Sequence, residues 1–346
     1  MRMFTVIEAD GTGALEARPA PDGRLLAPLD RSLLGWERKP HGWCRGEACL
    51  PAFRAADAET PDGVDVAAFA ALVGKVAVID VGERAVAFAD GAGPFGGGLT
   101  VEEAPDFTLD GVTLSDLRGR KVAIVFWASW CGCRYDLPAW RERHEALERH
   151  GLTVLTVALD RSAEDARPWI EGARGAGGAP PHPAVVDTEG LVAELYNVIN
   201  VPTVVWVDEK GRIARPQDTQ AATDLFRSMN GLDAEKSYRD LRRWVLEDDA
   251  GVAADRVAEH LRVPTDEERR ARAHARLAVW LLREGRAEAA RPHLDAAAAL
   301  APHDLAIRRG LMPLTGQDPF GDGYFALRDE LENAGIPIHR PLPDEE

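Results

Sequence analysis

The sequence is poor in cysteine, in net positive charge and in long apolar runs. No stretch approaches about 18 consecutive apolar residues, so we expect no transmembrane helix. Acidic residues outnumber basic ones by 57 to 41, giving a net charge of -16, which argues against a general nucleic-acid binder because phosphate contacts need a basic surface. The opening MRMFTVIEADGTG lacks the apolar core of a secretory signal, so we expect a cytoplasmic protein.

The four cysteines form two close pairs, Cys44/Cys49 and Cys131/Cys133. In a reducing compartment such pairs are more often redox-active or metal-binding than structural. His41 lies near the first pair, but three ligands at uneven spacing are a weak signal for zinc. We therefore predict no metal and no cofactor, and interpret Cys44 and Cys49 as an auxiliary redox pair that could relay electrons to Cys131. A structural or incidental pair in a Gly-rich turn is the alternative.

A chain of 346 residues is long enough for two or three domains. We predict a small α+β domain over 1–95, an α/β domain over 96–246 and a helical region over 247–346, with the Gly-rich stretch 91–98 as a linker. Within the first two domains, apolar patterning predicts strands at 4–8, 76–80, 85–89, 121–127 and 152–159, and helices at 65–73 and 138–150. It also predicts two strands within 202–213, joined by a turn at Glu209–Gly211. In the middle domain, strands and helices alternate, which implies a sheet with helices on both faces.

The C-terminal region contains a capping box, Thr265 to Glu268, before two apolar-periodic helices within 271–302 that are separated by Gly285. The pair resembles one tetratricopeptide unit. Its signature positions hold Leu277, Ala278, Gly285, Ala290, Leu294, Ala297 and Pro302. One such unit cannot bury its own apolar face. Either 232–262 and 303–335 are degenerate repeats or the pair docks on the middle domain, and a helical cap and a peptide-binding groove both remain open.

The segment FWASWCGCRYDLP, residues 126–138, carries the strongest chemical signal. A buried strand ends here, and two cysteines stand directly before an amphipathic helix. Unpaired N–H groups and the positive end of the helix dipole favour a thiolate at that position, so the thiol pKa should fall below its ordinary value. A thiolate can open a substrate disulfide, and a second cysteine close by can then release the product.

The surrounding motifs resemble the TlpA/ResA branch of the thioredoxin-like superfamily, which borders on the AhpC/TSA redoxins. The resemblance covers about 101–246 and rests on APDFTLDG, TLSDLRGRKVAIVFWASWC, ALDRS, AVVDTEGLVAELYNV and NVPTVVWVDEKGRI. It implies a thioredoxin-like central domain. It also implies roles for individual residues: Cys131 as the attacking cysteine, Cys133 as the resolving one, Trp130 and Arg134 as flanking residues, Pro138 as a helix proline that bends the first turns, and Pro202 as a cis-proline whose neighbour Val201 offers backbone to substrate.

Two departures from this family matter. Only Gly132 separates the cysteines, where the family has two residues, and Gly can adopt the backbone angles that such a short turn needs. A disulfide across Cys-Gly-Cys should be strained, which would raise its reduction potential and favour an oxidising or isomerising role. Alternatively, Cys133 pairs with nothing and Cys131 acts through glutathione or a distant partner. Val125 replaces a buried Asp of thioredoxins, so a proton relay needs water or another group such as Asp136 or Glu194.

We therefore predict a thiol–disulfide oxidoreductase that acts on protein or small-thiol disulfides, with an unidentified thiol as electron donor and no nucleic-acid or membrane partner. The main alternative is a redox-sensing or scaffolding protein whose helical C-terminal region binds a protein partner. A thiol peroxidase is less favoured, because Ser129 and Arg134 are the only near candidates for the hydroxyl and the cation that peroxide chemistry needs.

Overall fold

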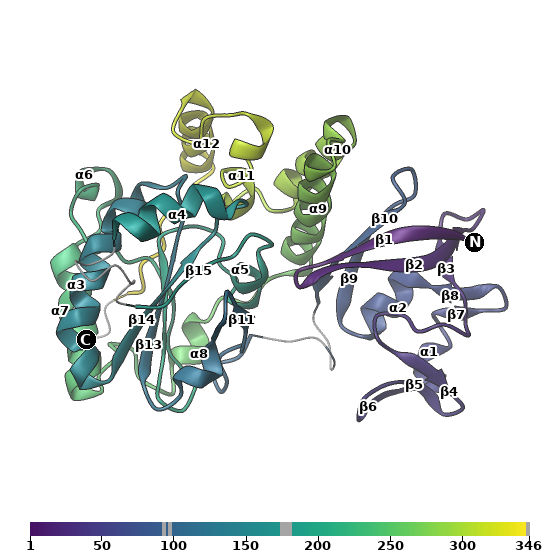
Figure 1. Cartoon of the computed structure of the whole chain (residues 1–346), viewed down its shortest axis with the longest axis horizontal. Coiled ribbons are helices and arrows are strands. Elements are labelled where there is room, and N and C mark those ends of the chain that lie inside the picture. The colour runs from purple at the N-terminus through teal and green to yellow at the C-terminus, as the bar shows by residue number, and fades with distance from the viewer. Residues whose placement is uncertain (92–94, 96–98, 174–181, 344–346) are drawn as a thin grey trace. The chain divides into compact units, whose positions relative to one another are not determined.

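The computed structural model describes residues 1–91, 95, 99–173 and 182–343 (Figure 1). The chain folds into two compact units. The first combines Met1–Gly98 with Pro264–Pro302, and the second combines Leu99–Val263 with His303–Glu346. The region 247–346 is helical, as the sequence predicted, but it is divided between the two units and is not a separate body. Apart from Gly91 and Phe95, the predicted linker 91–98 lies outside the described residues.

The first unit is built on a seven-stranded sheet with the strand order β7-β8-β3-β2-β1-β10-β9. Its strands are β1 (Arg2–Glu8), β2 (Gly11–Pro19), β3 (Leu25–Ala27), β7 (Glu59–Thr60), β8 (Gly63–Asp65), β9 (Lys75–Asp80) and β10 (Ala85–Asp90). Strand β1 runs parallel to β10, and the other pairs are antiparallel. Strands β1, β9 and β10 and the helix α2 (Val66–Leu72) coincide with the elements expected from the sequence.

Side chains of β10 alternate between the two faces of this sheet, as the two-residue period of a strand requires. Ala85, Ala87 and Ala89 share an apolar cluster with helix α9 (Asp266–Arg283), whereas Val86 and Phe88 lie in the cluster that contains α2. The three small alanine side chains let the helix approach the strand closely. The apolar face of α9, for which the sequence alone indicated no partner, therefore packs on strand β10 of its own unit.

The tetratricopeptide-like pair is thus a cap on the sheet of the first unit. Helix α10 (Ala287–Leu300) packs back on α9 after a turn at Gly285, where φ is +73°. Leu277 and Ala278 are fully buried against this sheet and α10. The expected docking on the middle domain is wrong, because the apolar face is covered by β9 and β10. The candidate neighbouring repeats, 232–262 and 303–335, belong to the second unit.

A three-stranded sheet completes the first unit and carries its two cysteines. Its strands are β4 (Glu37–Lys39), β5 (Gly42–Arg45) and β6 (Ala48–Pro51), and the helix α1 (Ala52–Ala55) follows. Cys44 and Cys49 are directly opposite each other in the β5–β6 hairpin and are joined by a disulfide. Trp43 and Leu50 anchor the hairpin in the core of the unit.

The second unit is built on a five-stranded sheet with the order β15-β14-β13-β16-β17. Its strands are β13 (Lys121–Trp127), β14 (Leu152–Ala158), β15 (Ala184–Val186), β16 (Thr203–Val207) and β17 (Ile213–Asp218). The first three run parallel, and β16 and β17 are antiparallel to their neighbours. A short hairpin of β11 (Thr108–Leu109) and β12 (Val112–Thr113) precedes the sheet. This is the α/β sheet with alternating helices that the middle of the sequence predicted.

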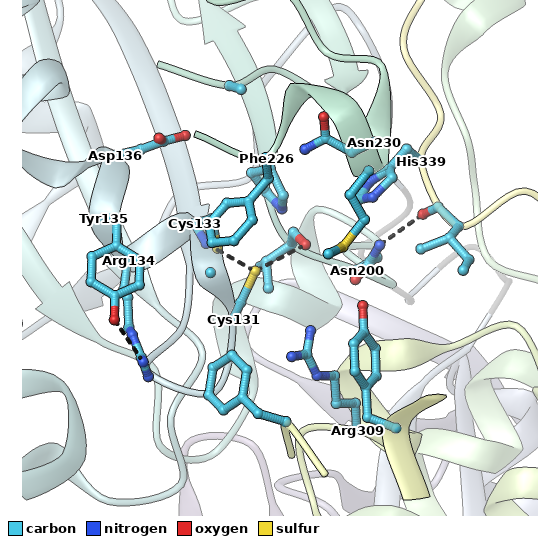
Figure 2. A pocket seen from close by; sticks show the side chains of 18 of the residues that line it. Cys131, Cys133, Arg134, Tyr135, Asp136, Asn200, Phe226, Asn230, Arg309 and His339 are labelled. Carbon is cyan, nitrogen blue, oxygen red and sulfur yellow. Dashed lines mark hydrogen bonds between the residues drawn. The ribbon is translucent and has the colours of Figure 1, made fainter. Parts of the chain in front are cut away.

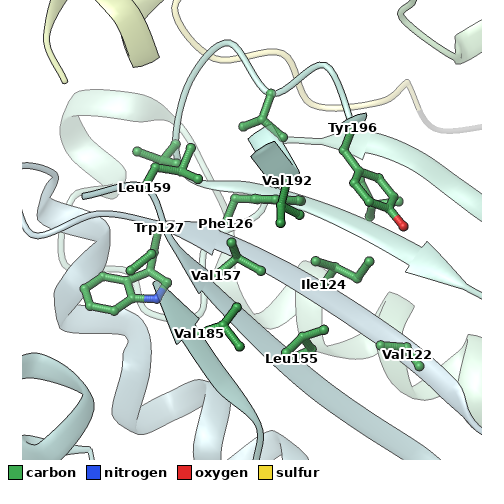
Figure 3. Close-up of a cluster of buried hydrophobic side chains, with 14 of the residues drawn as sticks. Val122, Ile124, Phe126, Trp127, Leu155, Val157, Leu159, Val185, Val192 and Tyr196 are labelled. Atoms are coloured by element: carbon green, nitrogen blue, oxygen red, sulfur yellow. The ribbon is translucent and has the colours of Figure 1, made fainter. Parts of the chain in front are cut away.

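Both faces of this sheet are covered, which explains the uninterrupted apolar strands. On one face, Val125 and Trp206 pack against α3 (Leu137–Leu147) and α7 (Ala234–Glu247). On the other, Ile124 and Val157 pack against Tyr196 and its neighbours (Figure 3). This second face also receives side chains from α4 (Ala163–Gly172), α5 (Leu191–Leu195) and α8 (Val257–His260). No described helix is both long and apolar enough to cross a lipid bilayer.

The last forty residues return to this second unit. The short helix α11 (Leu305–Arg308) and the longer α12 (Asp322–Asn333) of this segment lie outside the sheet. Another short helix, α6 (Arg227–Asn230), precedes α7 and also lies outside the sheet. The chain after α12 runs beside β17, where Arg340 exchanges hydrogen bonds with Thr219 and the Leu342 N–H donates to Asp218 at 2.7 Å. Strand β17 is at the edge of the sheet, so this segment satisfies polar groups that the edge would otherwise expose.

Candidate active site

Cys131 stands where the structure changes from strand to helix. Strand β13 ends at Trp127, and a 3₁₀ turn over Gly132–Asp136 leads directly into α3. Cys131 is the residue before that turn, and its sulfur accepts a hydrogen bond from the backbone N–H of Cys133 at 3.3 Å. The expected position of Cys131 at the start of a helix is thus observed.

The two thiols have opposite pKa shifts. Burial raises the pKa of Cys131, but the hydrogen bond from the Cys133 thiol, the charge of Arg309 and the Cys133 backbone N–H outweigh it, so the net pKa lies below the ordinary value. Burial, the same hydrogen bond and the negative charge on Cys131 raise the pKa of Cys133 well above its ordinary value. At neutral pH, Cys131 is therefore the better thiolate, while Cys133 holds its proton.

The loop before β16 lies beside the attacking sulfur. The Val201–Pro202 peptide bond is cis, as the family resemblance implied. The Cys131 thiol donates to the Val201 carbonyl oxygen at 3.5 Å. Val201 and Pro202 thus adjoin the sulfur, where backbone could meet an extended substrate.

A cavity of about 260 Å³ opens beside both cysteines (Figure 2). Among the residues predicted for the site, those that line it are Cys131, Gly132, Cys133, Arg134, Val201 and Pro202. Cys131 is only 6% exposed, so the cavity is the route by which a reagent reaches its sulfur.

Trp130 and Pro138 support the site without facing this cavity. Trp130 is 2% exposed, and its indole N–H donates to the Leu159 carbonyl oxygen at 3.1 Å. Trp130, which the family resemblance implied as a flanking residue, is therefore packed inside the second unit and does not line the cavity. Pro138 lies in the first turn of α3, where the missing N–H has no helical partner to lose.

Gly132 and Arg134 shape the entrance to the cavity. A Cβ atom on Gly132 would lie 2.6 Å from the ring of Phe226, so the missing side chain makes room for that ring. The guanidinium of Arg134 lies over the rings of Trp169 and Phe320, with its carbon 4.4 and 4.6 Å from their centroids. Arg134 also donates to the Ser129 carbonyl oxygen at 2.5 Å, so its role is to brace this turn.

Asp136 is the buried carboxylate of the cavity. It accepts hydrogen bonds from the Ala222 N–H at 2.9 Å and from the Thr223 hydroxyl at 2.5 Å. Burial raises its pKa despite these bonds, and its charge in turn raises the pKa of both cysteines. Glu194, the other relay residue suggested by the sequence, does not line the cavity, and Val125 lies in the apolar core.

The hydroxyl expected for a peroxidase is not presented to the cavity. Ser129 donates both its N–H and its hydroxyl to Asp160. Burial raises the pKa of this carboxyl to about 6. Ser129 does not line the cavity, so it does not present, together with Arg134, the hydroxyl and the cation that the sequence suggested for peroxide chemistry.

Sequence reasoning missed much of the lining of the cavity. The lining residues that it missed include Asn200, Phe226 and Asn230, and a group from the last forty residues that forms one wall: Arg309, Phe320, Tyr324, Phe325, Ile338 and His339. Asn200 adjoins the Val-Pro-Thr motif and could have been found there. The late residues stand in no motif, and no local pattern indicated that their segment returns to this site.

The second cysteine cluster lies in the first unit. Cys44 is buried and Cys49 is exposed. The Nε2 atom of His41 is 3.3 Å from the Cys44 sulfur and 3.8 Å from the Cys49 sulfur. The three side chains thus form a compact cluster of potential ligand atoms, all within 4.8 Å of one another, in which the disulfide engages both sulfurs.

Comparison with known proteins agrees with this geometry. The model of the AhpC/TSA family matches residues 101–215. The thioredoxin-like protein YneN of Bacillus subtilis (strain 168) is 34% identical over 137 residues, which cover 37% of this chain and 75% of YneN. The chain belongs to the thioredoxin-like family. This confirms the predicted redoxin domain and the predicted oxidoreductase class.

Other thiol-disulfide oxidoreductases are also similar to part of this chain. The thiol-disulfide oxidoreductase ResA of Geobacillus kaustophilus (strain HTA426) is 28% identical over 116 residues, covering 32% of this chain and 64% of ResA. Among solved structures, the thioredoxin domain of a thiol-disulfide oxidoreductase from Bacteroides vulgatus is 24% identical, with a TM-score of 0.34, and covers 42% of this chain and 98% of that domain.

Proposed function

We propose that Cys131 and Cys133 carry out thiol–disulfide exchange, with Cys131 as the nucleophile and Cys133 as the resolving thiol. The observation that carries this proposal is the opposite shift of the two pKa values beside one cavity. A lowered pKa supplies the attacking thiolate, and a raised pKa keeps the second thiol protonated until the first bond has formed.

The exchange proceeds in two balanced steps. The Cys131 thiolate attacks one sulfur of a substrate disulfide, a Cys131–substrate disulfide forms, and the other half of the substrate leaves as a thiolate. Cys133 then loses its proton and attacks the Cys131 sulfur, which releases the second substrate thiolate and leaves a Cys131–Cys133 disulfide. The substrate has gained two electrons, and an external thiol must reduce the protein for another cycle.

Asp136 is the group that we propose accepts the proton of Cys133. Its raised pKa makes it a better base than an ordinary aspartate would be in the same place. The negative charge of Asp136 raises the pKa of Cys133 and so opposes its ionisation. When Asp136 takes the proton this charge is neutralised, so the proton transfer and the attack of Cys133 on the mixed disulfide are coupled. This role follows from the same cavity that holds the two thiols.

Reduction of bis(2-hydroxyethyl) disulfide, a small neutral substrate, tests the proposal. We expect Cys131→Ser to abolish turnover, and Cys133→Ser to react once and accumulate a mixed disulfide on Cys131 that mass spectrometry detects. The control is the double variant Cys44→Ser/Cys49→Ser, which leaves both active-site thiols in place. Turnover that persists in Cys131→Ser would refute the proposal.

A second candidate function concerns the disulfide of the first unit. We propose that Cys44 and Cys49 are an auxiliary redox pair in which an incoming thiolate attacks the exposed Cys49 sulfur and Cys44 leaves as a thiolate. The specific observation is His41 at 3.3 Å from the Cys44 sulfur, where its ring can donate a hydrogen bond to the leaving thiolate. The hairpin closes through its own backbone hydrogen bonds, so it can survive reduction.

Alkylation and mass spectrometry across glutathione redox buffers test the auxiliary pair. We expect the pair to open reversibly, and glutathione disulfide to form a mixed disulfide at least about ten times faster with Cys49 in Cys44→Ser than with Cys44 in Cys49→Ser, releasing one glutathione thiolate in each case, because accessibility governs exchange. A pair that stays closed in excess reduced glutathione is structural, and the auxiliary role then fails. The same titration measures the potential of Cys131/Cys133, whose oxidising poise stays a prediction.

A further inference from the structure

The wall of the cavity opposite the cysteines comes from residues 303–343, which lie outside the stretch 101–215 matched by the family model. The chain leaves the second unit after Val263 and re-enters it at His303. Helix α11 then docks beside the loop that carries the cis-proline 202, with the Ala306 N–H donating to the Ile199 carbonyl oxygen at 3.0 Å. The chemistry of this wall is therefore a property of this chain and not of the shared domain.

Arg309 is the cation of that wall. It is 5% exposed, and its guanidinium carbon lies 3.6 Å from the centroid of the Tyr324 ring, so the ring fixes the plane of the cation. Its Nε–H donates to the Pro319 carbonyl oxygen at 2.9 Å. In Figure 2 the guanidinium projects into the cavity near the sulfur of Cys131. Within the described ranges, no carboxylate forms an ion pair with it.

The adjacent arginine has a different role. Arg308 makes two hydrogen bonds with the carboxylate of Glu330, at 2.7 and 2.8 Å, and does not line the cavity. The two consecutive arginines thus differ in their partners. The charge of Arg308 is neutralised by Glu330, whereas Arg309 lies near the Cys131 sulfur and forms no ion pair with a carboxylate of the described residues. The chain itself therefore provides a matched control for the charge of Arg309.

The other charged groups of the cavity do not compete for this position. Arg134 is bonded to the Ser129 carbonyl and the Tyr135 hydroxyl, and Asp136 is bonded to Ala222 and Thr223. The group beside which Arg309 lies is the Cys131 sulfur, and the charge of Arg309 helps to lower the pKa of that thiol and so favours its thiolate. When that thiolate becomes part of a mixed disulfide its charge is gone, and Arg309 is left facing the bound substrate half.

The size of the cavity restricts what that half can be. A volume of about 260 Å³ lies just under the roughly 300 Å³ at which small-molecule sites begin, so it holds a small thiol moiety or a short chain segment. The aromatic side chains of the late segment, Phe320, Tyr324 and Phe325, narrow it from the side opposite the cysteines.

Resting on the exchange function proposed above, we infer that Arg309 selects low-molecular-weight disulfides that carry a carboxylate near the disulfide, of the glutathione disulfide type, over neutral and cationic ones. The Cys131 thiolate attacks one sulfur of such a disulfide, the mixed disulfide forms, and the other half leaves as a thiolate. The carboxylate of the bound half pairs with Arg309 while its sulfur is joined to Cys131.

The test measures the first step in the Cys133→Ser background, with three disulfides of different charge: glutathione disulfide, bis(2-hydroxyethyl) disulfide and cystamine. The rate ratio of the anionic to the neutral disulfide is the readout, because a change in Cys131 reactivity alters both rates together and largely cancels. We expect Arg309→Gln to lower this ratio about tenfold and Arg309→Lys to preserve most of it. Arg308→Gln should leave it unchanged.

The wild-type protein supplies a second measurement that requires no variant to fold. We expect Cys131 to lose its preference for iodoacetate over iodoacetamide as salt rises from about 0.01 M to about 1 M, because salt screens the attraction. An unchanged disulfide ratio in Arg309→Gln, a salt-independent iodoacetate preference, or faster turnover of insulin than of glutathione disulfide would overturn the inference. Failure of all three disulfides to react at Cys131 would instead overturn the exchange function itself.

Discussion

Substituting Gly132 by Ala tests how tightly the active-site turn is packed. The new Cβ would lie 2.6 and 2.8 Å from two carbon atoms of the Phe226 ring and 3.2 Å from a third. Contacts below about 3.0 Å cannot persist, so the ring must move. Phe226 is half-buried at the start of α6, and the atoms in contact are the far edge of its ring, so rotation is possible but strained.

The expected loss of stability follows from that movement. A side chain forced about 30° from its rotamer costs about 1 kcal/mol, and inserting a methyl group into a packed site costs about 1–3 kcal/mol. We therefore expect Gly132→Ala to lower the free energy of unfolding by about 1–2 kcal/mol. The φ angle of Gly132 is not positive, so the backbone itself accepts alanine.

The same substitution in a Phe226→Ala background isolates the contact, because that background removes the ring. Urea unfolding of the second unit can be followed by pulse labelling of free thiols, since Cys131 and Cys133 are free and buried while Cys44 and Cys49 are joined. We expect a coupling energy of about 1–2 kcal/mol between the two substitutions. An equal loss of stability in both backgrounds would refute the packing argument.

Three further predictions concern the cavity and its wall. Burial and the charges of two arginines lower the pKa of His339 to about 4. Because the unfolded chain binds a proton at this histidine more readily than the folded chain, the free energy of unfolding decreases as pH falls from about 6.5 to 4. Urea titrations at the two pH values should show that His339→Gln reduces this acid-induced loss by about 2–3 kcal/mol. Asp136→Asn should shift the pH profile of Cys131 alkylation to lower pH and slow the Cys133 step, and an unshifted profile would contradict the charge effect. Gly310→Ala should cost at least about 2 kcal/mol and make the late segment more sensitive to protease, because its Cβ would lie 2.2 Å from a backbone oxygen and 3.2 Å from Trp130; unchanged proteolysis would argue against the docking.

The central domain could be predicted from the sequence because its signals are local. A buried strand, a tryptophan, two cysteines and a helix follow one another within residues 121–150, and the structure keeps that order. The cis-proline 202 is far from Cys131 in sequence, but family resemblance supplied it. Local propensity and family pattern therefore sufficed for the cysteines and for the loop beside them.

The rest of the cavity could not be predicted, because it depends on where distant segments return. Arg309 follows a four-residue helix, and nothing in its neighbourhood distinguishes it from Arg308. Likewise, the small residues on one face of α9 indicated that another element packs there, but not which one. Strands β9 and β10 and a neighbouring repeat could each have packed closely against these alanines. Burial of Trp130 follows from packing by Gly310, which no spacing rule relates to it.

The division of residues between the two units has a consequence for how the protein is made. The sheet of the first unit begins at Arg2, yet the helices that cover one of its faces end only at Leu300. During synthesis on the ribosome, that face of the first sheet stays without its helices until the whole sheet of the second unit has been synthesised. The sheet of the first unit therefore reaches its native packing only after residue 300 has been synthesised, and a chain cut at residue 246 would leave both units incomplete.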